Sequence, residues 1–217
     1  MPYICLLLSG AALLANGLAA LGQLPRRDAA VFSLVLGGTQ LVLGVVHISG
    51  TGTGTEALMT AAGMFLFGLT YVYAGLDVLL GLGSKGLGWF CGMVAFVGLL
   101  LAGTWLGIDP LLAVLWACWS LLWGLLFASS ALGAVRLEPF SGWALVLASQ
   151  VTATVPAFLG LAGVWPRSSW AAGVAALLVA AVFLAARALA RRGPGGPRRA
   201  NAGASEQAVG QERLTAG

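Results

Sequence analysis

Seven long apolar stretches follow one another along the chain, and short connections rich in glycine, threonine, proline or charge separate them. Each stretch has about the 20 residues that a helix needs to cross a bilayer. The pattern predicts membrane-spanning helices over residues 3–22, 30–49, 56–80, 87–107, 110–134, 141–164 and 170–189. We therefore expect an all-α fold, a polytopic transmembrane helical bundle whose outer surface faces membrane lipid.

The overall composition supports a membrane protein. Of the 217 residues, 59% are hydrophobic and 8% are charged, and the mean hydropathy is +0.95. A chain of this composition cannot cover a single core with a water-compatible surface. The formal net charge of +4 comes from basic residues that flank the spans, so we interpret it as membrane topology and not as nucleic-acid binding.

The positions of the basic residues predict the orientation of the chain. If the N-terminus lies outside, Arg167 is the one basic residue that falls on the outer side. Cytoplasmic connections carry an excess of Lys and Arg, so we expect the N-terminus outside and the C-terminus in the cytoplasm, which requires an odd number of spans. Residues 191–217, rich in glycine, proline and arginine, are expected to form a disordered basic cytoplasmic tail.

Acidic residues lie at or near the ends of the predicted spans: Asp28, Glu56, Asp77, Asp109 and Glu138. A proton relay needs ionisable groups inside the bilayer, so this pattern argues against an ion-coupled transporter. Intramembrane catalysis would need paired carboxylates, a nucleophile with its base, or clustered metal ligands, and the cysteines have no metal-binding spacing. We therefore expect neither an enzyme nor a metal site or cofactor.

Aromatic side chains recur along one face of the fifth predicted span. Trp116, Trp119, Trp123 and Phe127 are spaced at i, i+3, i+7 and i+11, which aligns them along a helix. Trp119 and Trp123 fall in the middle of the span, where an interfacial belt does not explain them. The remaining tryptophans lie near span ends and are typical of such a belt: Trp89, Trp105, Trp143, Trp165 and Trp170.

The third predicted span carries a matching aromatic pair, Phe67 and Tyr71, four residues apart on one face. If this face opposes the tryptophans of the fifth span, the two form a flat-walled slot that suits a small planar molecule with amide hydrogens. The alternative interpretation is ordinary helix packing, which is the commoner reason for an aromatic stripe.

A few uncharged polar residues remain inside the spans: Asn16, Gln40, Thr70, Gln150, Thr152 and Thr154. Such side chains usually form hydrogen bonds to a neighbouring helix, although a neutral polar solute can also form hydrogen bonds to them one after another as it crosses. Asn16, Thr70, Gln150 and Thr152 are accordingly candidates for polar pore residues or for helix packing.

The chain resembles the AmiS/UreI family of short-chain amide transporters and urea channels. The strings that carry the resemblance lie in the same order over residues 1–165: Ala15–Gly17, Phe65–Tyr73, Lys85–Cys91, Trp116–Trp123, and Trp143 followed by Thr152–Ala157. The resemblance implies a six-helix channel domain over 1–165, a homo-oligomer that in the urea channel is a hexamer, and a place in the bacterial cytoplasmic (inner) membrane.

By the same resemblance, the pore narrows around its solute at Leu13, Phe67, Tyr71, Trp116, Trp119 and Trp123. The implied function is a passive channel for urea or short-chain aliphatic amides, and family habit implies a metabolic link to a cytosolic amidase or urease. The rival interpretation from another class is a structural or assembly membrane protein without a solute pore, which would tolerate aliphatic residues in place of these rings.

The chain departs from the family pattern in three respects. Ala148 stands where the urea channel has a carboxylate, and His47 is the one histidine, so we do not expect acid gating. Residues 166–190 extend beyond the six spans and are long enough to form an additional transmembrane helix. That seventh helix could alter the oligomer interface.

Overall fold

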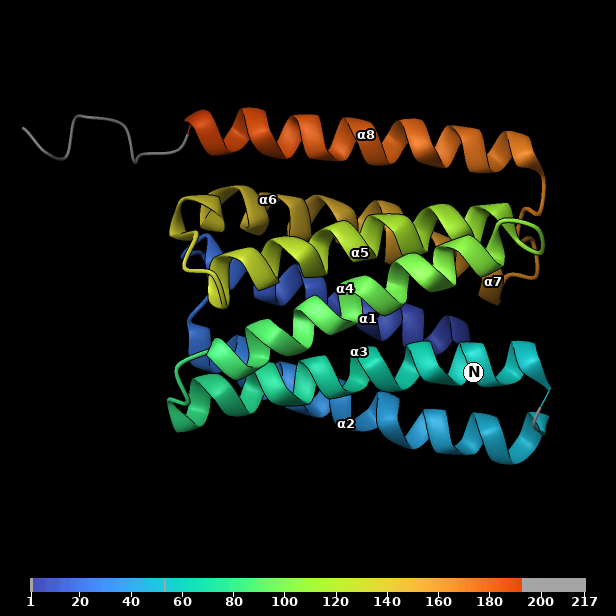
Figure 1. Ribbon diagram of the computed structural model, residues 1–217, viewed down its shortest axis with the longest axis horizontal. Helices are drawn as coiled ribbons and strands as arrows, with labels where there is room; N and C mark the ends of the chain where they lie inside the picture. The colour runs from blue at the N-terminus through green and yellow to red at the C-terminus, as the bar shows by residue number, and fades with distance from the viewer. Residues whose placement is uncertain (1, 53, 193–217) are drawn as a thin grey trace, which may run out of the picture.

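The computed structural model describes residues 2–52 and 54–192, and the secondary-structure elements in this part of the chain are all helices (Figure 1). The elements are α1 (Pro2–Ala20), α2 (Arg26–Thr51), α3 (Thr55–Leu80), α4 (Lys85–Trp105), α5 (Pro110–Ser130), η1 (Val135–Leu137), α6 (Glu138–Ala148), η2 (Ser149–Thr154), α7 (Val155–Leu161) and α8 (Ser169–Arg192). Seven helical segments are long and apolar enough to cross a membrane, the sixth running from Val135 to Leu161. The predicted all-α transmembrane fold is confirmed. Most of the predicted tail, residues 193–217, lies outside the described residues.

The second span begins earlier and ends later than the sequence predicted. It starts at Arg26, directly after Pro25, and continues to Thr51 in the glycine- and threonine-rich stretch that was expected to be a connection. Pro25 cannot continue a helix toward the N-terminus but is compatible with its start, and Gly52 ends it with a positive φ of 76°. The connections at both ends of α2 are therefore shorter than expected.

The connection between α3 and α4 is held by a buried carboxylate. Asp77 accepts a 2.9 Å hydrogen bond from the backbone N–H of Ser84 and a second bond from the Ser84 hydroxyl. Gly81 ends α3 in the left-handed conformation, with φ 65° and ψ 42°. Asp77 therefore anchors this connection, and its burial is explained by the geometry of the loop.

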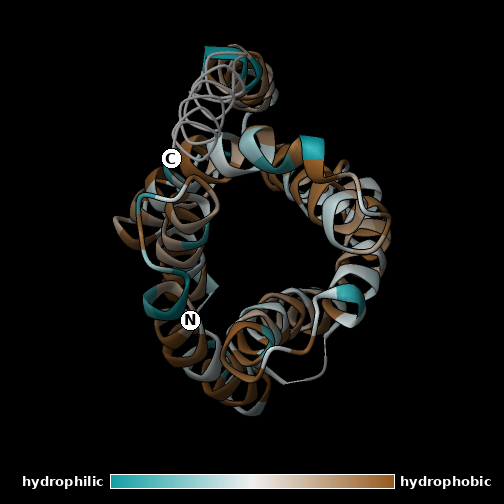
Figure 2. Ribbon diagram, turned by 90° about the vertical axis from the view of Figure 1, so that its left-hand side faces the viewer, coloured by the Kyte–Doolittle hydropathy of each residue, from teal (hydrophilic) through white to brown (hydrophobic). Residues whose placement is uncertain are grey.

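The helices form a ring when the molecule is viewed along the bundle (Figure 2). Helix α1 contacts α2 and α6, α2 packs along α3, and α4 packs along α5. Gly37 allows the close approach of α2 and α3, since a Cβ there would lie 2.7 Å from the Gly68 carbonyl oxygen. Helix α8 lies outside the ring and packs against both α5 and α6.

The outer surface of the bundle is apolar. Large hydrophobic side chains are exposed on several helices, including Trp89, Phe96, Leu177 and Trp170, which is 80% exposed. Soluble monomers rarely expose so continuous an apolar surface, whereas lipid solvates it. Trp89 and Trp170 also lie near helix ends, in agreement with the predicted interfacial belt.

The sixth span is interrupted by a π-helical turn, η2, in which the Val155 N–H donates to the Gln150 carbonyl five residues back. Thr154 donates through its hydroxyl to the Ser149 carbonyl, also five residues back, at 3.0 Å. Pro156 follows directly and has no N–H to donate to the Thr152 carbonyl in α-helical register. The missing donor gives a local reason for the wider turn, and such turns are frequent at functional sites.

Candidate functional site

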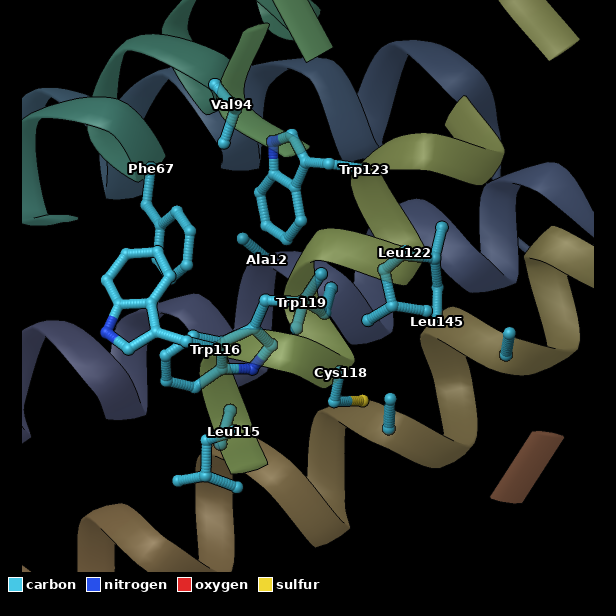
Figure 3. Packing of buried hydrophobic residues seen from close by; sticks show 14 of the residues in the cluster. Ala12, Phe67, Val94, Leu115, Trp116, Cys118, Trp119, Leu122, Trp123 and Leu145 are labelled. Atoms are coloured by element: carbon cyan, nitrogen blue, oxygen red, sulfur yellow. The ribbon is translucent and has the colours of Figure 1, made fainter. Parts of the chain in front are cut away.

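Aromatic rings from α3 and α5 meet inside the bundle (Figure 3). Phe67 is central: its ring centroid lies 5.3 Å from Trp116, 5.2 Å from Trp119 and 4.7 Å from Trp123. Tyr71, one turn further along α3, lies 6.4 Å from Trp123. The structure therefore brings the two predicted aromatic faces together.

The rings of Phe67 and Trp123 stack directly, with an interplanar angle of 15°. A flat solute has no room between these two rings, which differs from the open slot expected from the sequence. Phe67 meets Trp119 edge-on, at 85°, and Trp116 meets Trp119 at 80°. Stacked and edge-to-face contacts are the favourable geometries for aromatic pairs, so the cluster is well packed in the described state.

Two threonines hold the tryptophan rings in place. The indole N–H of Trp119 donates to the Thr152 hydroxyl at 3.2 Å, and that of Trp123 donates to the Thr70 hydroxyl at 3.1 Å. Each threonine donates in turn to a carbonyl four residues back, Thr152 to Ala148 at 2.8 Å and Thr70 to Leu66 at 2.7 Å. Both indole donors are thus satisfied, and the rings present apolar surface to the interior.

A cavity of about 220 Å³ opens at the end of the bundle that carries the N-terminus. We call it the N-terminal cavity. Phe67, Trp116 and Trp119 form part of its wall, and Glu56, Asp109 and Arg167 also line it. Its surroundings are therefore polar and charged toward the mouth and aromatic toward the centre of the bundle.

Two further tryptophans, Trp105 and Trp165, line the N-terminal cavity. Their positions near span ends had predicted an interfacial belt instead. Trp105 is buried in the bundle. Trp165 donates its indole N–H to the Asp109 carboxylate at 2.7 Å, and its ring lies 5.4 Å from that of Tyr3. Asp109 also caps α5 by accepting from the Leu112 N–H at 3.0 Å, so one carboxylate fixes both the helix start and the tryptophan.

A second cavity, of about 330 Å³, lies at the other end of the bundle. We call it the opposite cavity. Asn16, Arg26, Glu138 and Ser141 line it, together with apolar residues that include Leu145. Like the N-terminal cavity, it carries charges of both signs, so neither cavity favours an ion of one sign throughout.

Of the six predicted pore residues, three lie between the two cavities and line neither: Leu13, Tyr71 and Trp123. They are 3%, 3% and 1% exposed, respectively, and we call them the closed layer. The Tyr71 hydroxyl is buried and makes no hydrogen bond within the described part of the chain. The closed layer is therefore thin and uncharged, and it offers one unused polar group.

Helices α1 and α2 are joined by two side-chain amides, one next to each cavity. Asn16 donates to the Ala12 carbonyl and to Ser33, both at 2.8 Å. Gln40 donates to the Cys5 carbonyl at 2.6 Å and to the Ser9 hydroxyl at 2.7 Å. The predicted candidate Gln150 lies elsewhere, exposed and outside the lining of both cavities.

A metal-binding cluster is not found in the described ranges. No three His, Cys, Asp or Glu residues within 2–52 and 54–192 are placed to hold a metal ion. Cys5, Cys91 and Cys118 are buried free thiols. The chemistry that the interior offers is therefore hydrogen bonding near each cavity and apolar contact between them.

The chain is similar in sequence to known membrane transporters. Residues 1–164 match the family described as AmiS/UreI family transporter. A putative transporter protein AmiS2 from Rhodococcus erythropolis is 39% identical over 193 residues, covering 86% of this chain and 94% of that protein. A putative amidate substrates transporter protein from Mycolicibacterium smegmatis is 34% identical over 187 residues, covering 84% of this chain and 87% of that protein.

The fold is also similar to a solved structure. The crystal structure of the urea channel from the human gastric pathogen Helicobacter pylori superposes with a TM-score of 0.69 at 27% identity, covering 76% of this chain and 100% of that chain. The family match ends at residue 164. The match to the Rhodococcus protein covers 86% of this chain, which is more than the first 164 residues, so it extends past α7.

Proposed function

The chain belongs to the AmiS/UreI family of transporters, and from this premise we propose that it is a passive channel for urea or short-chain aliphatic amides in the bacterial cytoplasmic membrane. The observation that carries the proposal is the pair of cavities at opposite ends of the bundle, separated by the closed layer of Leu13, Tyr71 and Trp123. The relatives, which are described as amide-type transporters and a urea channel, support the choice of solute.

Passage begins in the N-terminal cavity or in the opposite one, where the solute is still partly hydrated. At the closed layer the solute loses its water and contacts aromatic and aliphatic side chains, which change rotamer to let it pass. Because Phe67 and Trp123 already stack on each other, the solute passes where their rings separate or along their edges toward Leu13. The aromatic surfaces remain well suited to a planar amide.

Selectivity follows from the cost of dehydration. An isolated ion that enters an apolar layer loses hydration worth tens of kcal/mol on a Born estimate, whereas an unpaired neutral amide loses roughly 2–7 kcal/mol. The closed layer has no fixed charge to replace an ion's water, and its Tyr71 hydroxyl can bond to a neutral solute. The closed layer is therefore permeable to small neutral molecules and excludes ions.

Orientation, assembly and partners extend this proposal. Arg26, Lys85 and Arg136 begin or precede helices at the end opposite the N-terminus, which supports an outside N-terminus and a cytoplasmic C-terminus. A homo-oligomer, by family resemblance a hexamer, would have to accommodate α8 on the outside of α5 and α6. A cytosolic amidase or urease would consume the imported solute.

The competing function is a structural or assembly membrane protein without a pore. The close packing of Phe67 against three tryptophans is the observation that favours it. Such a protein would keep its role if the rings were replaced by large aliphatic side chains and the core stayed filled, because only packing would matter.

The test is stopped-flow light scattering on proteoliposomes challenged with urea and then acetamide. Wild type is compared with the double variant Tyr71→Ala, Trp119→Ala, and with Trp89→Ala, Trp170→Ala, which removes two exposed rings. Solute-driven swelling faster than in empty liposomes, changed by the first pair and not by the second, is expected. Swelling no faster than in empty liposomes, with inserted and folded wild-type protein, would favour the structural role.

A further inference from the structure

A buried amide beside the N-terminal cavity has an unused acceptor. Gln40 on α2 is 0% exposed and borders the cavity. Its Nε2 group is fully engaged, with the Cys5 carbonyl and the Ser9 hydroxyl as acceptors. Its Oε1 atom makes no hydrogen bond within the described part of the chain. Buried polar atoms without a partner are uncommon in native proteins and call for an explanation.

Two hydroxyls accompany this acceptor. Ser9 accepts from Gln40, which leaves its own hydrogen free to donate. The Tyr71 hydroxyl, which faces Ser9, is one of the other buried polar groups that make no hydrogen bond within the described part of the chain. Tyr71 belongs to the closed layer, so Ser9, Gln40 and Tyr71 stand where the N-terminal cavity ends and the closed layer begins.

We infer that Gln40 and Ser9 form a recognition site for the primary amide group, in which Gln40 Oε1 accepts a solute N–H and the Ser9 hydroxyl donates to the solute carbonyl. The inference rests on the proposed channel function and specifies which chemical group the channel selects. The two residues offer one acceptor and one donor, which is the complement of an amide. Gln40 lines the N-terminal cavity, so Oε1 can accept from a solute there while Nε2 keeps its bonds to Cys5 and Ser9.

The site explains how a solute loses water in steps. A neutral amide that enters an apolar layer without partners is strongly disfavoured. Hydrogen bonds to Gln40 and Ser9 replace water before the solute reaches Leu13 and Trp123. On the other side, Asn16 borders the opposite cavity and is half-buried, so polar contacts are available again after the closed layer.

The role of Gln40 can be separated from solute size with three isomers. Propionamide, N-methylacetamide and N,N-dimethylformamide have the same atoms but carry two, one and no N–H groups. Their fluxes are measured by light scattering in proteoliposomes of the full chain, with the flux through empty liposomes subtracted. Wild type is expected to conduct propionamide best and N,N-dimethylformamide least.

Gln40→Met keeps the side-chain length and removes the acceptor together with the Nε2 bonds to Cys5 and Ser9. It should lower the propionamide flux about two- to tenfold more than the flux of N,N-dimethylformamide, the range expected for one lost hydrogen bond, because any change at Ser9 is common to all three isomers. Ser9→Ala should lower the flux of all three isomers alike, since each has a carbonyl. Gln150→Met is the matched control, because Gln150 is exposed and borders neither cavity.

Each outcome has a defined meaning. Equal effects of Gln40→Met on all three isomers, or none, would overturn the recognition site while the channel function stands. Absence of any protein-dependent flux in wild type would overturn both. If Gln40→Met is not recovered folded, Gln40→Asn keeps the amide but withdraws it by one methylene, and the same loss of preference for propionamide is expected.

Discussion

Trp119 on α5 donates its indole N–H to the hydroxyl of Thr152 at 3.2 Å, and Thr152 lies inside the π-helical turn of the sixth span. The wider turn therefore contacts the aromatic cluster directly. Thr152 is fixed in turn by its bond to the Ala148 carbonyl. The irregular helix and the orientation of a tryptophan beside the cavity are linked through one hydroxyl group.

Replacing Thr152 with Val should test this link. Valine has nearly the same shape but no acceptor, so the buried indole N–H of Trp119 loses its partner. An orphaned buried donor costs about 1–3 kcal/mol, and we expect a lower thermal unfolding midpoint in detergent together with altered urea flux. The control is Thr39→Val, because the exposed Thr39 hydroxyl bonds only to Val35 of its own helix. Equal stability of the two variants would contradict the prediction.

Removal of the Tyr71 hydroxyl should affect transport more than folding. Because this hydroxyl is buried without a hydrogen bond, Tyr71→Phe removes an unsatisfied group and should not lower the unfolding midpoint. Urea flux in proteoliposomes should fall a few-fold, since the closed layer loses its polar contact. Tyr73→Phe, at a position that borders neither cavity, serves as the control. A destabilised variant with normal flux would show that the hydroxyl has only a structural role.

A methyl group at position 63 should narrow the N-terminal cavity. A Cβ on Gly63 would lie 2.7 Å from Cζ2 of Trp116, so Gly63→Ala must displace that ring. We expect reduced flux of the larger amides relative to urea, and a stability loss of about 1–3 kcal/mol from overpacking. Gly38→Ala, where a Cβ would meet nothing within 4 Å, should leave the flux ratio unchanged.

The sequence was sufficient for the fold class and for the facing aromatic residues. Seven apolar stretches of bilayer length fix the helices, and helical spacing puts Trp116, Trp119 and Trp123 on one face. The π-helical turn was missed because the analysis of hydrophobic periodicity assumes 3.6 residues in every helical turn. The one local signal was Pro156 following the polar run Ser149–Thr154.

Trp105 shows how the side of a helix can be misjudged. It lies near a span end, which also suits a lipid-facing ring, but the structure buries it beside the N-terminal cavity. A signal was present: Cys91, Val94, Gly98, Leu101 and Trp105 recur at intervals of three or four, and all are buried. Gln40 was identified only as a polar residue in a span, because an unused acceptor is visible only in three dimensions.

Flux should depend only weakly on pH. The chain has one histidine, His47, and it borders neither cavity. An imidazole has an ordinary pKa of about 6.5 and is the usual group to titrate in this range, so urea flux at pH 5 and pH 7 should agree within about twofold. Light scattering at matched inner and outer pH is the measurement. Activation of several-fold on acidification would refute the prediction.

The proposed orientation can be checked by labelling intact cells. Gly54 precedes α3 at the N-terminal end, and Leu82 lies in the α3–α4 connection at the other end. A membrane-impermeant maleimide should label Gly54→Cys in intact cells and Leu82→Cys only after lysis. The native cysteines are buried, so background labelling should be low. The reverse pattern would place the N-terminus in the cytoplasm.

The uncharged closed layer has an electrical consequence. The membrane voltage falls mainly across the driest part of a pore. Moving one elementary charge across that part changes the free energy by about 2.3 kcal/mol per 100 mV. Urea and amides carry no net charge, and Leu13, Tyr71 and Trp123 contribute none. The proton-motive force therefore has nothing to act on, and in the proposed channel the concentration difference of the solute across the membrane sets the direction of net flow.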